Sequence, residues 1–405
     1  MKTKILMSIS AVALACMMVL MASPITSVTD ANNGRTNGDD EFVPEFTDRE
    51  VIVFSDEKFV SEVGCALIDS TSRVDSSASK TPAENTIALV DESWLADSSK
   101  GRPSTNQIKN MLYNSIPLIF VKGDSYLYKD SGIELRTGSP PSKNSVAYGL
   151  YYGPSGVVYS FECGEGMELE EALLRIYAMA DDAIAADLEY SKEKESIGRA
   201  PAGPYWEQAL VVLRSYPCDN KGCLNVSTTY YKLKNWNEAY TYYAIKHGQS
   251  AIPGSGTSYK VADIYLNNTL PNGHEVKDTL PVTTSGQTTS SVSFTMASEG
   301  GLSATVGWSY SISDVKTINT SIHGGKKINI WHDVSEDKNV GLGYTAYSGV
   351  EIRVGNNVNN GSLHIVDDYK VQFSQKYDKY FFGLYYGSGW NFYNHTFSVA
   401  VSISN

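Results

Sequence analysis

The stretch that decides the fold is Val292-Ser-Phe-Thr-Met-Ala-Ser-Glu-Gly-Gly-Leu-Ser-Ala-Thr-Val-Gly-Trp-Ser-Tyr-Ser-Ile312, in which apolar and polar side chains alternate. A period of two predicts two strands with one buried and one solvated face, and the Gly-Gly pair supplies a turn. The apolar positions are Val292, Phe294, Met296, Leu302, Ala304, Val306, Trp308, Tyr310 and Ile312. We therefore predict a long β-hairpin and a β-rich C-terminal half.

The solvated face of this hairpin, residues 291–313, is almost entirely Ser and Thr and carries almost no charge. Alternating aliphatic and hydroxyl residues are typical of strands that insert into membranes as a barrel. In this composition the segment resembles the stems of secreted β-pore-forming toxins, and the resemblance implies membrane insertion. An ordinary sandwich hairpin has the same pattern, and the turn at Glu299-Gly300-Gly301 favours a hairpin fixed in a sandwich.

The N-terminus sets the expected compartment. Residues 1–23 combine basic Lys2 and Lys4 with an apolar run of about 18 residues that ends before Ser23-Pro24. This pattern predicts a signal peptide, and an uncleaved membrane anchor is the alternative. We expect a secreted or cell-surface protein.

The charge of the chain restricts its partners. The net charge is −12, and loss of Lys2 and Lys4 with the signal peptide would make it −14. An acidic surface opposes binding to DNA, RNA and anionic membranes. We predict no nucleic-acid partner, and membrane contact only through the N-terminal segment or the hairpin 291–313.

The order of the expected elements predicts two domains after a flexible leader at 24–47. Short buried strands alternate with a short helix, and a hairpin and one long amphipathic helix follow. We expect these elements at 51–54, 86–90, 106–113, 117–121, 146–163 and 168–194. They predict a three-layer-like α/β domain with a mostly parallel sheet over residues 48–197.

A Gly- and Pro-rich linker at 198–204 separates this domain from the rest. After the linker, many short strands are punctuated by Gly, Asn and Pro, with the last two expected at 380–386 and 397–403. This pattern predicts an antiparallel β-sandwich over residues 205–405.

Aromatic residues carry the main functional prediction. Tyr385-Tyr386-Gly-Ser-Gly-Trp390-Asn-Phe-Tyr393 would place an indole at a loop tip, where a sugar ring or a protein could stack. We predict a non-enzymatic protein that binds a glycan or a protein at a cell surface through Trp390, Tyr386 and Tyr393. The alternative is a pore-forming protein that uses the hairpin 291–313. Half-exposed tyrosines on ordinary β faces explain the same composition.

Enzyme motifs give little support to catalysis. All six histidines lie after residue 204, and no nucleophile-elbow, zinc-protease or phosphate-loop motif is present. Asp91 and Asp124 follow predicted parallel strands, where ligands of α/β sheets bind. They keep open a second alternative, an extracellular hydrolase with a site between the domains. We predict no cofactor and no bound metal.

Covalent modification follows from the expected export. Four cysteines lie beyond the signal segment, and the turn sequence between two of them predicts the disulfides Cys218–Cys223 and Cys65–Cys163. Asn-x-Ser/Thr sequons predict glycosylation in the β-rich half. These sequons start at Asn225, Asn267, Asn319, Asn360 and Asn394.

Overall fold

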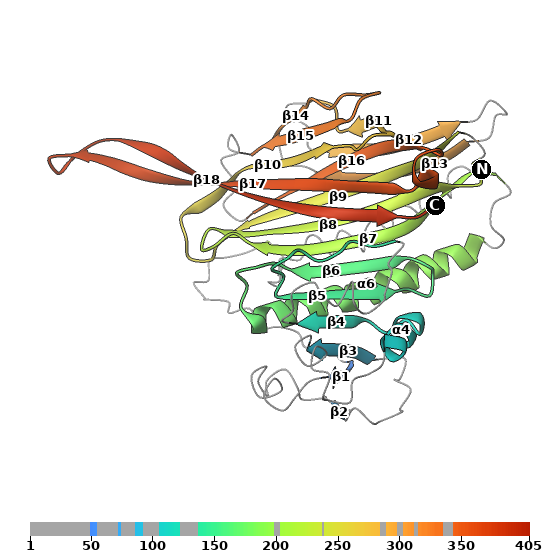
Figure 1. Ribbon diagram of the computed structural model, residues 1–405. Coiled ribbons are helices and arrows are strands. Elements are labelled where there is room, and N and C mark those ends of the chain that lie inside the picture. Colours follow the sequence, from blue (N-terminus) through green and yellow to red (C-terminus); the bar gives the residue numbers. More distant parts are fainter. Residues whose placement is uncertain are drawn as a thin grey trace.

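The chain is predominantly β. The computed structural model describes residues 49–54, 72–73, 86–91, 105–121, 137–197, 203–236, 239–283, 289–297, 303–311, 315–334 and 343–405. The strands within these ranges form three sheets of eleven, five and two strands (Figure 1).

The largest sheet is mixed and runs from one end of the molecule to the other. In spatial order it contains β11 (His274–Leu280), β16 (Tyr344–Gly355), β9 (Tyr240–Pro253), β8 (Gly222–Lys234), β7 (Tyr205–Pro217), β6 (Val158–Cys163), β5 (Ala147–Tyr152), β4 (Leu118–Val121), β3 (Thr86–Asp91), β1 (Glu50–Phe54) and β2 (Ser72–Arg73). The long strands β7, β8 and β9 pair antiparallel, whereas β1, β2, β3 and β4 pair parallel.

The five-stranded sheet covers one face of the long strands of the large sheet. Its order is β14 (Lys316–Asn319), β15 (Lys327–Asp333), β10 (Tyr259–Thr269), β17 (Leu363–Phe381) and β18 (Leu384–Ile403). Side chains of both sheets share one core, in which Tyr230 and Ile245 lie with Leu266 and Tyr369. The third sheet is the hairpin of β12 (Thr289–Ala297) and β13 (Ser303–Ser311).

Two α-helices lie within the described ranges, on opposite faces of the large sheet. The long helix α6 (Leu169–Ile197) packs Leu173 and Ile176 against one face, and α4 (Thr105–Tyr113) packs Leu112 against the other. A 3-10 turn at Asn359–Gly361 precedes β17. No helix in the described part of the chain is both long enough and apolar enough to cross a bilayer.

The predicted fold class is wrong. The strands at 50–54, 86–91 and 118–121 do pair parallel, but β5 and β6 then pair antiparallel. The helix α6 next returns the chain so that β7 lies parallel to β6, and the sheet therefore continues past residues 198–204. The result is a large mixed sheet that is mostly antiparallel, rather than a mostly parallel three-layer domain. The division into two domains at 198–204 stays a prediction.

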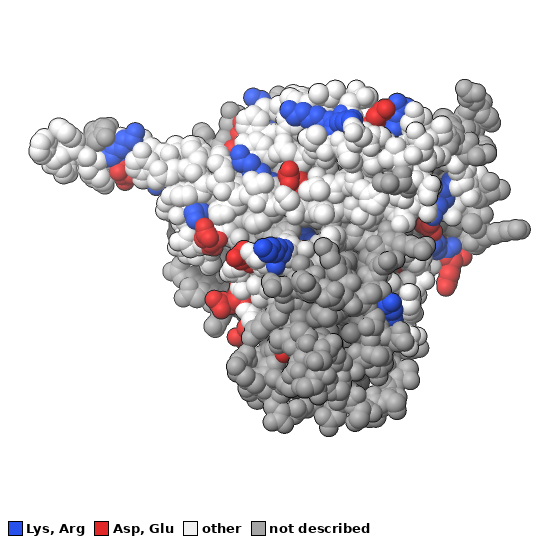
Figure 2. Space-filling model, viewed as in Figure 1, with Lys and Arg blue, Asp and Glu red and all other residues white. Residues whose placement is uncertain are grey.

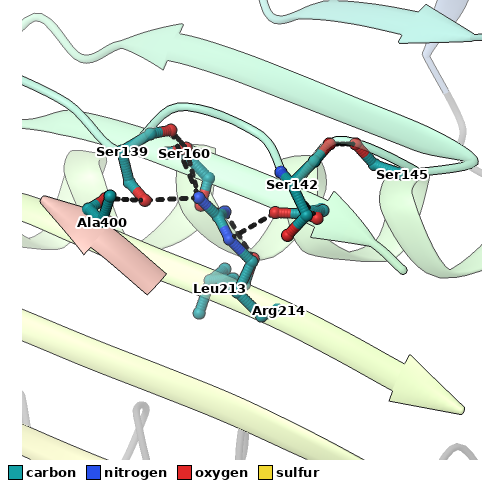
Figure 3. A network of polar contacts seen from close by, with 8 residues as sticks. Ser139, Ser142, Ser145, Ser160, Leu213, Arg214 and Ala400 are labelled. Atoms are coloured by element: carbon teal, nitrogen blue, oxygen red, sulfur yellow. Dashed lines mark hydrogen bonds and ion pairs between the residues drawn. The ribbon is translucent and has the colours of Figure 1, made fainter. Parts of the chain in front are cut away.

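A buried ion pair links β6 to β7, where the large sheet continues past residues 198–204. Arg214 in β7 and Glu162 in β6 are each 1% exposed, with 2.9 Å between Arg214 Nε and Glu162 Oε2. The guanidinium also donates to the Ser160 carbonyl oxygen and the Ser139 hydroxyl (Figure 3). Ser139 in turn donates to the Ala400 carbonyl in β18. Since each charge has its partners, we assign this network a structural role.

Candidate functional site

The hairpin predicted at 291–313 is confirmed as β12 and β13. Its ladder runs without a register shift from Thr289 opposite Ser311 to Ala297 opposite Ser303. The hairpin lies on the face of the large sheet that α6 also covers, since Trp206 and Val211 of β7 contact the hairpin and the helix respectively. It therefore adds a small second layer to the end of the sheet beyond the helix.

The inward face of the hairpin is apolar and buried. Phe294 is 1% and Trp308 5% exposed, and both pack with Ala244 and Tyr347 of the large sheet. Ala304 packs in a neighbouring cluster with Leu233 and Tyr242. The alternation in the sequence therefore predicted the inward direction of Phe294, Ala304 and Trp308 correctly. The side chains of Val292, Met296, Leu302, Tyr310 and Ile312 lie outside the described residues.

The outward face of the hairpin consists of hydroxyl side chains in water. Ser293, Thr295, Ser303 and Thr305 are all exposed. Thr295 and Thr305 lie opposite each other across the two strands, with 2.9 Å between their hydroxyl oxygens. The predicted solvated face is confirmed at these four positions.

The hairpin is held to the body by packing more than by hydrogen bonds. Neither strand pairs with a strand of another sheet in the described ranges. The Trp206 indole N–H donates to the Ala304 carbonyl oxygen over 3.3 Å. The buried indole N–H of Trp308 has no acceptor among the described residues, which costs stability in the docked position.

The sheet face that carries the hairpin also carries two buried charged groups. Lys246 lies two residues from Ala244 on β9, and Glu351 lies opposite Ala244 on β16, so all three side chains share this face. Burial lowers the pKa of Lys246 to about 8. Burial, with repulsion from Asp278, raises the pKa of Glu351 to about 7, against a smaller opposing effect of Lys277.

The three aromatic residues predicted to bind a ligand do not converge. Trp390 lies within β18 opposite Lys376, not at a loop tip, and is 48% exposed. Tyr393 is three residues further along the strand and so faces the other side of the ladder. Its ring packs edge-on against Tyr259, with centroids 5.4 Å apart. The side chain of Tyr386 lies outside the described residues.

The sequence analysis missed a more exposed apolar group nearby. Phe381, Phe382 and Leu384 are 68%, 91% and 75% exposed at the turn between β17 and β18. The single strand predicted over 380–386 is wrong, because the chain turns at Phe382 and Gly383, whose φ values are 49° and 80°. The run Tyr380-Phe-Phe-Gly-Leu-Tyr385, which lacks polar alternation, was the available signal.

The described cysteines are free thiols. Cys218 points into the core between the sheets, whereas Cys223 lies towards Arg175 of α6 on the other face. These opposite directions explain why the predicted Cys218–Cys223 disulfide is not formed in the structure. Cys163 is buried and its thiol donates to the Ala172 carbonyl oxygen. Its predicted partner Cys65 lies outside the described residues.

The predicted glycosylation sites differ in accessibility. Asn360 and Asn394 are exposed, whereas Asn225, Asn267 and Asn319 are half-buried. The Asn319 side-chain amide donates to the Pro281 carbonyl oxygen over 2.8 Å, so a glycan there would displace an internal contact. Glycosylation at these five positions stays a prediction.

The alternative of an acidic site at Asp91 and Asp124 gains no support from the geometry. Asp91 is 3% exposed at the end of β3, and Asp124 lies outside the described residues. In the described ranges, no three His, Cys, Asp or Glu side chains are grouped as metal ligands would be. The buried carboxylate of Asp367 accepts hydrogen bonds from Tyr230 and Asn268 inside the core, a structural arrangement.

Comparisons with known proteins give only weak likenesses. No family model and no curated protein match the sequence. A solved structure described as a pore forming protein is 12% identical with a TM-score of 0.32, and the match covers 48% of this chain and 89% of that one. The NetB toxin of Clostridium perfringens in its membrane inserted form is 6% identical with a TM-score of 0.29, covering 44% and 91%. Such TM-scores do not establish a shared fold.

Proposed function

We propose that the protein permeabilises lipid bilayers by inserting the hairpin β12–β13. The observation that carries this proposal is the attachment of the hairpin: an amphipathic two-stranded sheet rests on the body through its apolar face. Its release breaks side-chain packing and one long hydrogen bond from Trp206, but no ladder to another described strand. Its displacement leaves the eleven-stranded and five-stranded sheets intact.

The dimensions of the hairpin suit a bilayer. Each strand has nine residues, and a tilted strand crosses the hydrocarbon core with about 9–11. Alternation would then place Phe294, Val306 and Trp308 towards lipid and the Ser and Thr residues towards water. In both states the apolar face of the hairpin would be buried, against the large sheet or in lipid, and the hydroxyl face would contact water.

The free edges of the hairpin require further copies of the chain. Backbone N–H and C=O groups must all be paired inside a bilayer, and a single hairpin leaves both outer edges unpaired. Hairpins from several copies would pair edge to edge into a closed ring. We therefore propose a homo-oligomer in the membrane, with the hydroxyl faces lining its water-filled interior.

Transfer from the sheet to lipid is energetically plausible because the apolar side chains stay in apolar surroundings. Full burial of each large apolar side chain contributes about 1.5–3 kcal/mol, which water exposure would forfeit but lipid would restore. The buried Trp308 N–H, which has no acceptor among the described residues, weakens the docked state further. The proposal also requires that the chain is exported, because only an exported chain reaches an outer membrane surface. Export stays a prediction.

Release of a trapped dye from phosphatidylcholine vesicles tests the proposal. The wild-type chain should release the dye, and a variant with residues 289–311 replaced by a Gly-Ser linker should not. The linker variant must keep the folded signal of the remaining sheets, because the hairpin pairs with none of them. Release of a small dye with retention of a large dextran would distinguish a pore from bilayer rupture.

A cysteine scan supplies the matched control. Single cysteines at Phe294 and Val306, or at Thr295 and Thr305, carry an environment-sensitive dye in a background without native cysteines. In vesicles, brominated phospholipids should quench the dye only at the first pair, because that face meets the lipid chains. Full release by the linker variant, or equal quenching at both pairs, would exclude insertion of this hairpin.

A further inference from the structure

The hairpin of β17 and β18 extends beyond the sheet to which it belongs. The strand β17 pairs with β10 from Asp368 to Gln375 and beyond that point pairs only with β18. Residues 376–390 therefore form a two-stranded projection from the body (Figure 1). Together with Asn391 and Phe392 at its base, opposite Gln375 and Ser374, they are here called the finger (residues 376–392). The finger shares no residue with β12–β13.

Exposed apolar side chains concentrate on the finger. Thirteen large hydrophobic residues in the described ranges are exposed, and eight of them lie there. The eight are Tyr377, Tyr380, Phe381, Phe382, Leu384, Tyr385, Trp390 and Phe392. Scattered exposed apolar residues are ordinary, but a concentration of this kind marks an interaction surface.

The turn at the tip contains an aromatic residue that the stability of the fold does not require. Phe382 adopts a left-handed conformation that a bulky side chain rarely takes, and two-residue turns of this kind favour Asn or Asp at that position. Its ring is 91% exposed and packs edge-on with Phe381 at a centroid distance of 4.6 Å. Asn or Asp would stabilise this turn better than Phe. We therefore attribute the ring at this position to contact with an external partner.

The distribution of the aromatic side chains favours a lipid surface over a protein. Trp390 lies opposite Lys376 in the ladder and Tyr377 opposite Gly389, so the indole and the phenol face opposite sides of the finger. A Cβ at Gly389 would meet the Tyr377 ring at 2.7 Å, and the ring therefore lies across this glycine. A protein docked on one face would leave the other exposed, whereas a bilayer surrounds both.

The order of side chains along the finger matches the layers of a bilayer surface. Phe381, Phe382 and Leu384 form the tip, and tyrosines and Trp390 follow behind it. Tyrosine and tryptophan favour the headgroup region, while purely apolar side chains enter the hydrocarbon. The finger thus has the gradient from apolar to amphipathic that interfacial anchors show.

Charge on the finger agrees with this partner. The chain carries a net charge of −12, but residues 376–392 contain Lys376, Lys379 and Asp378, a net charge of +1. The other residues of the finger are uncharged, and the face of the projection visible in Figure 2 is mostly white. The Lys379 ammonium lies 5.9 Å from the centre of the Tyr377 ring. Both lysines lie between the tip and the body.

We propose that the finger docks the protein on phospholipid bilayers, with the Phe381–Leu384 turn inserted and the lysines at the headgroups. This inference goes beyond pore formation because docking needs neither release of β12–β13 nor a second copy. It differs from the expectation that membrane contact is restricted to the N-terminal segment and the hairpin 291–313, which stays untested.

Flotation with phosphatidylcholine vesicles tests the docking. The double substitution Phe382→Ser and Leu384→Ser should weaken binding about a hundredfold, because two apolar side chains lose their insertion. Val366→Ser is the matched control, since Val366 is 49% exposed on β17 outside the finger. The control should change binding less than about twofold.

A second readout leaves the tip unaltered. Brominated lipids should quench part of the tryptophan fluorescence of the wild-type chain and less of it in Trp390→Phe. Undiminished binding by the double variant, or equal quenching in both chains, would overturn the proposal. Binding to glycans or proteins but never to pure phosphatidylcholine would overturn it too.

The two proposals fail separately. The linker variant without β12–β13 should bind vesicles as tightly as the wild type and release no dye. Binding without release by the wild type would leave the finger proposal standing and remove pore formation. Release that survives the double substitution at the tip would do the reverse.

Discussion

The pentapeptide Gly-Leu-Tyr-Tyr-Gly occurs twice, at 149–153 and 383–387, and its two copies have opposite environments. In the first, Leu150 is 1% and Tyr151 2% exposed within β5. In the second, Leu384 is 75% and Tyr385 60% exposed on the finger. Identical side chains are therefore core residues in one place and surface residues in the other.

The difference lies in what surrounds each strand. The first copy runs between β4 and β6, with α6 on one face of the sheet and α4 on the other. The second begins β18 beyond the last contact of β17 with β10, where no third strand or helix of the described chain follows. The apolar residues of the finger are exposed because the finger projects beyond the sheet, and an external partner can therefore contact them.

Truncation of the leucine in each copy gives the largest contrast. Leu150→Ala should lower the free energy of unfolding by about 2–5 kcal/mol, because a fully buried side chain leaves a cavity. Leu384→Ala should change it by less than about 0.5 kcal/mol and weaken vesicle binding instead. Urea denaturation measures the first effect and flotation the second. Equal destabilisation by both substitutions would mean that the finger is packed in solution.

The face of the large sheet beneath β12–β13 buries ionisable side chains, in contrast to the exposed finger. Glu351 is 5% exposed and its pKa is raised by burial to about 7, above the ordinary 4.5. Between these values the folded chain holds a proton that the unfolded chain has lost, so stability should fall as pH rises from 4.5 to 7. Glu351→Gln should remove a fall on the order of 2 kcal/mol, measured by urea denaturation at pH 5 and pH 7.

Lys246 provides the opposite slope as a control. Its pKa is lowered by burial from 10.5 to about 8, so the unfolded chain holds the extra proton between these values. Stability should therefore rise from pH 8 to 10.5, and Lys246→Met should flatten this rise without affecting the acidic range. A flat profile in the wild-type chain across both ranges would show that water reaches this face of the sheet.

The first glycine of each copy is restricted for a different reason. A Cβ on Gly149 would come within 2.5 Å of the Phe161 ring and 3.0 Å of the Leu118 carbonyl oxygen, so Gly149→Ala should cost about 1–3 kcal/mol. Gly383 has open space but a φ of 80°, and Gly383→Ala should cost about 1–2 kcal/mol through the backbone alone. Gly383→Asn, which tolerates this conformation, should recover most of that loss, whereas Gly149→Asn should worsen it.

Local patterns predicted local structure well. The alternation at 292–312 placed both strands of β12–β13 and their buried face, and the apolar spacing at 168–194 placed α6 at Leu169–Ile197. These properties depend on neighbours within a few residues. The partners of Phe294, namely Ala244 and Tyr347, come from strands about 50 residues away in either direction, and no local pattern specifies them.

Pairing between distant strands and projection from the body were not predictable in the same way. The parallel contact of β6 with β7 depends on the path of α6, and that contact invalidated the predicted fold class. Trp390 is exposed but lies within β18 and not at the predicted loop tip. Phe382 was not singled out, since Phe-Gly is not a usual two-residue turn. The repeated pentapeptide makes the limit explicit, because a sequence pattern that occurs in both environments cannot distinguish them.

The two exposed hairpin surfaces differ in chemistry, with hydroxyl groups on β12–β13 and aromatic rings on the finger. Substitution in the hydroxyl surface should have the smallest effect on stability. Thr295 and Thr305 form an exposed cross-strand pair, a contact worth about 0.2–1 kcal/mol. Replacing both by Val keeps the shape and the β-propensity, so unfolding should change by less than about 0.5 kcal/mol. Vesicle binding should be unchanged because the finger is intact.

Dye release should nevertheless fall in this double variant. If the hydroxyl face lines the interior of a pore, valines there would place apolar groups in every copy where water and solute must pass. Release per bound molecule, measured on the same vesicles used for flotation, separates this effect from docking. Val at Ser293 and Ser303, on the same face, should act in the same direction. Unaltered release in both variants would show that this face meets something other than the water inside a pore.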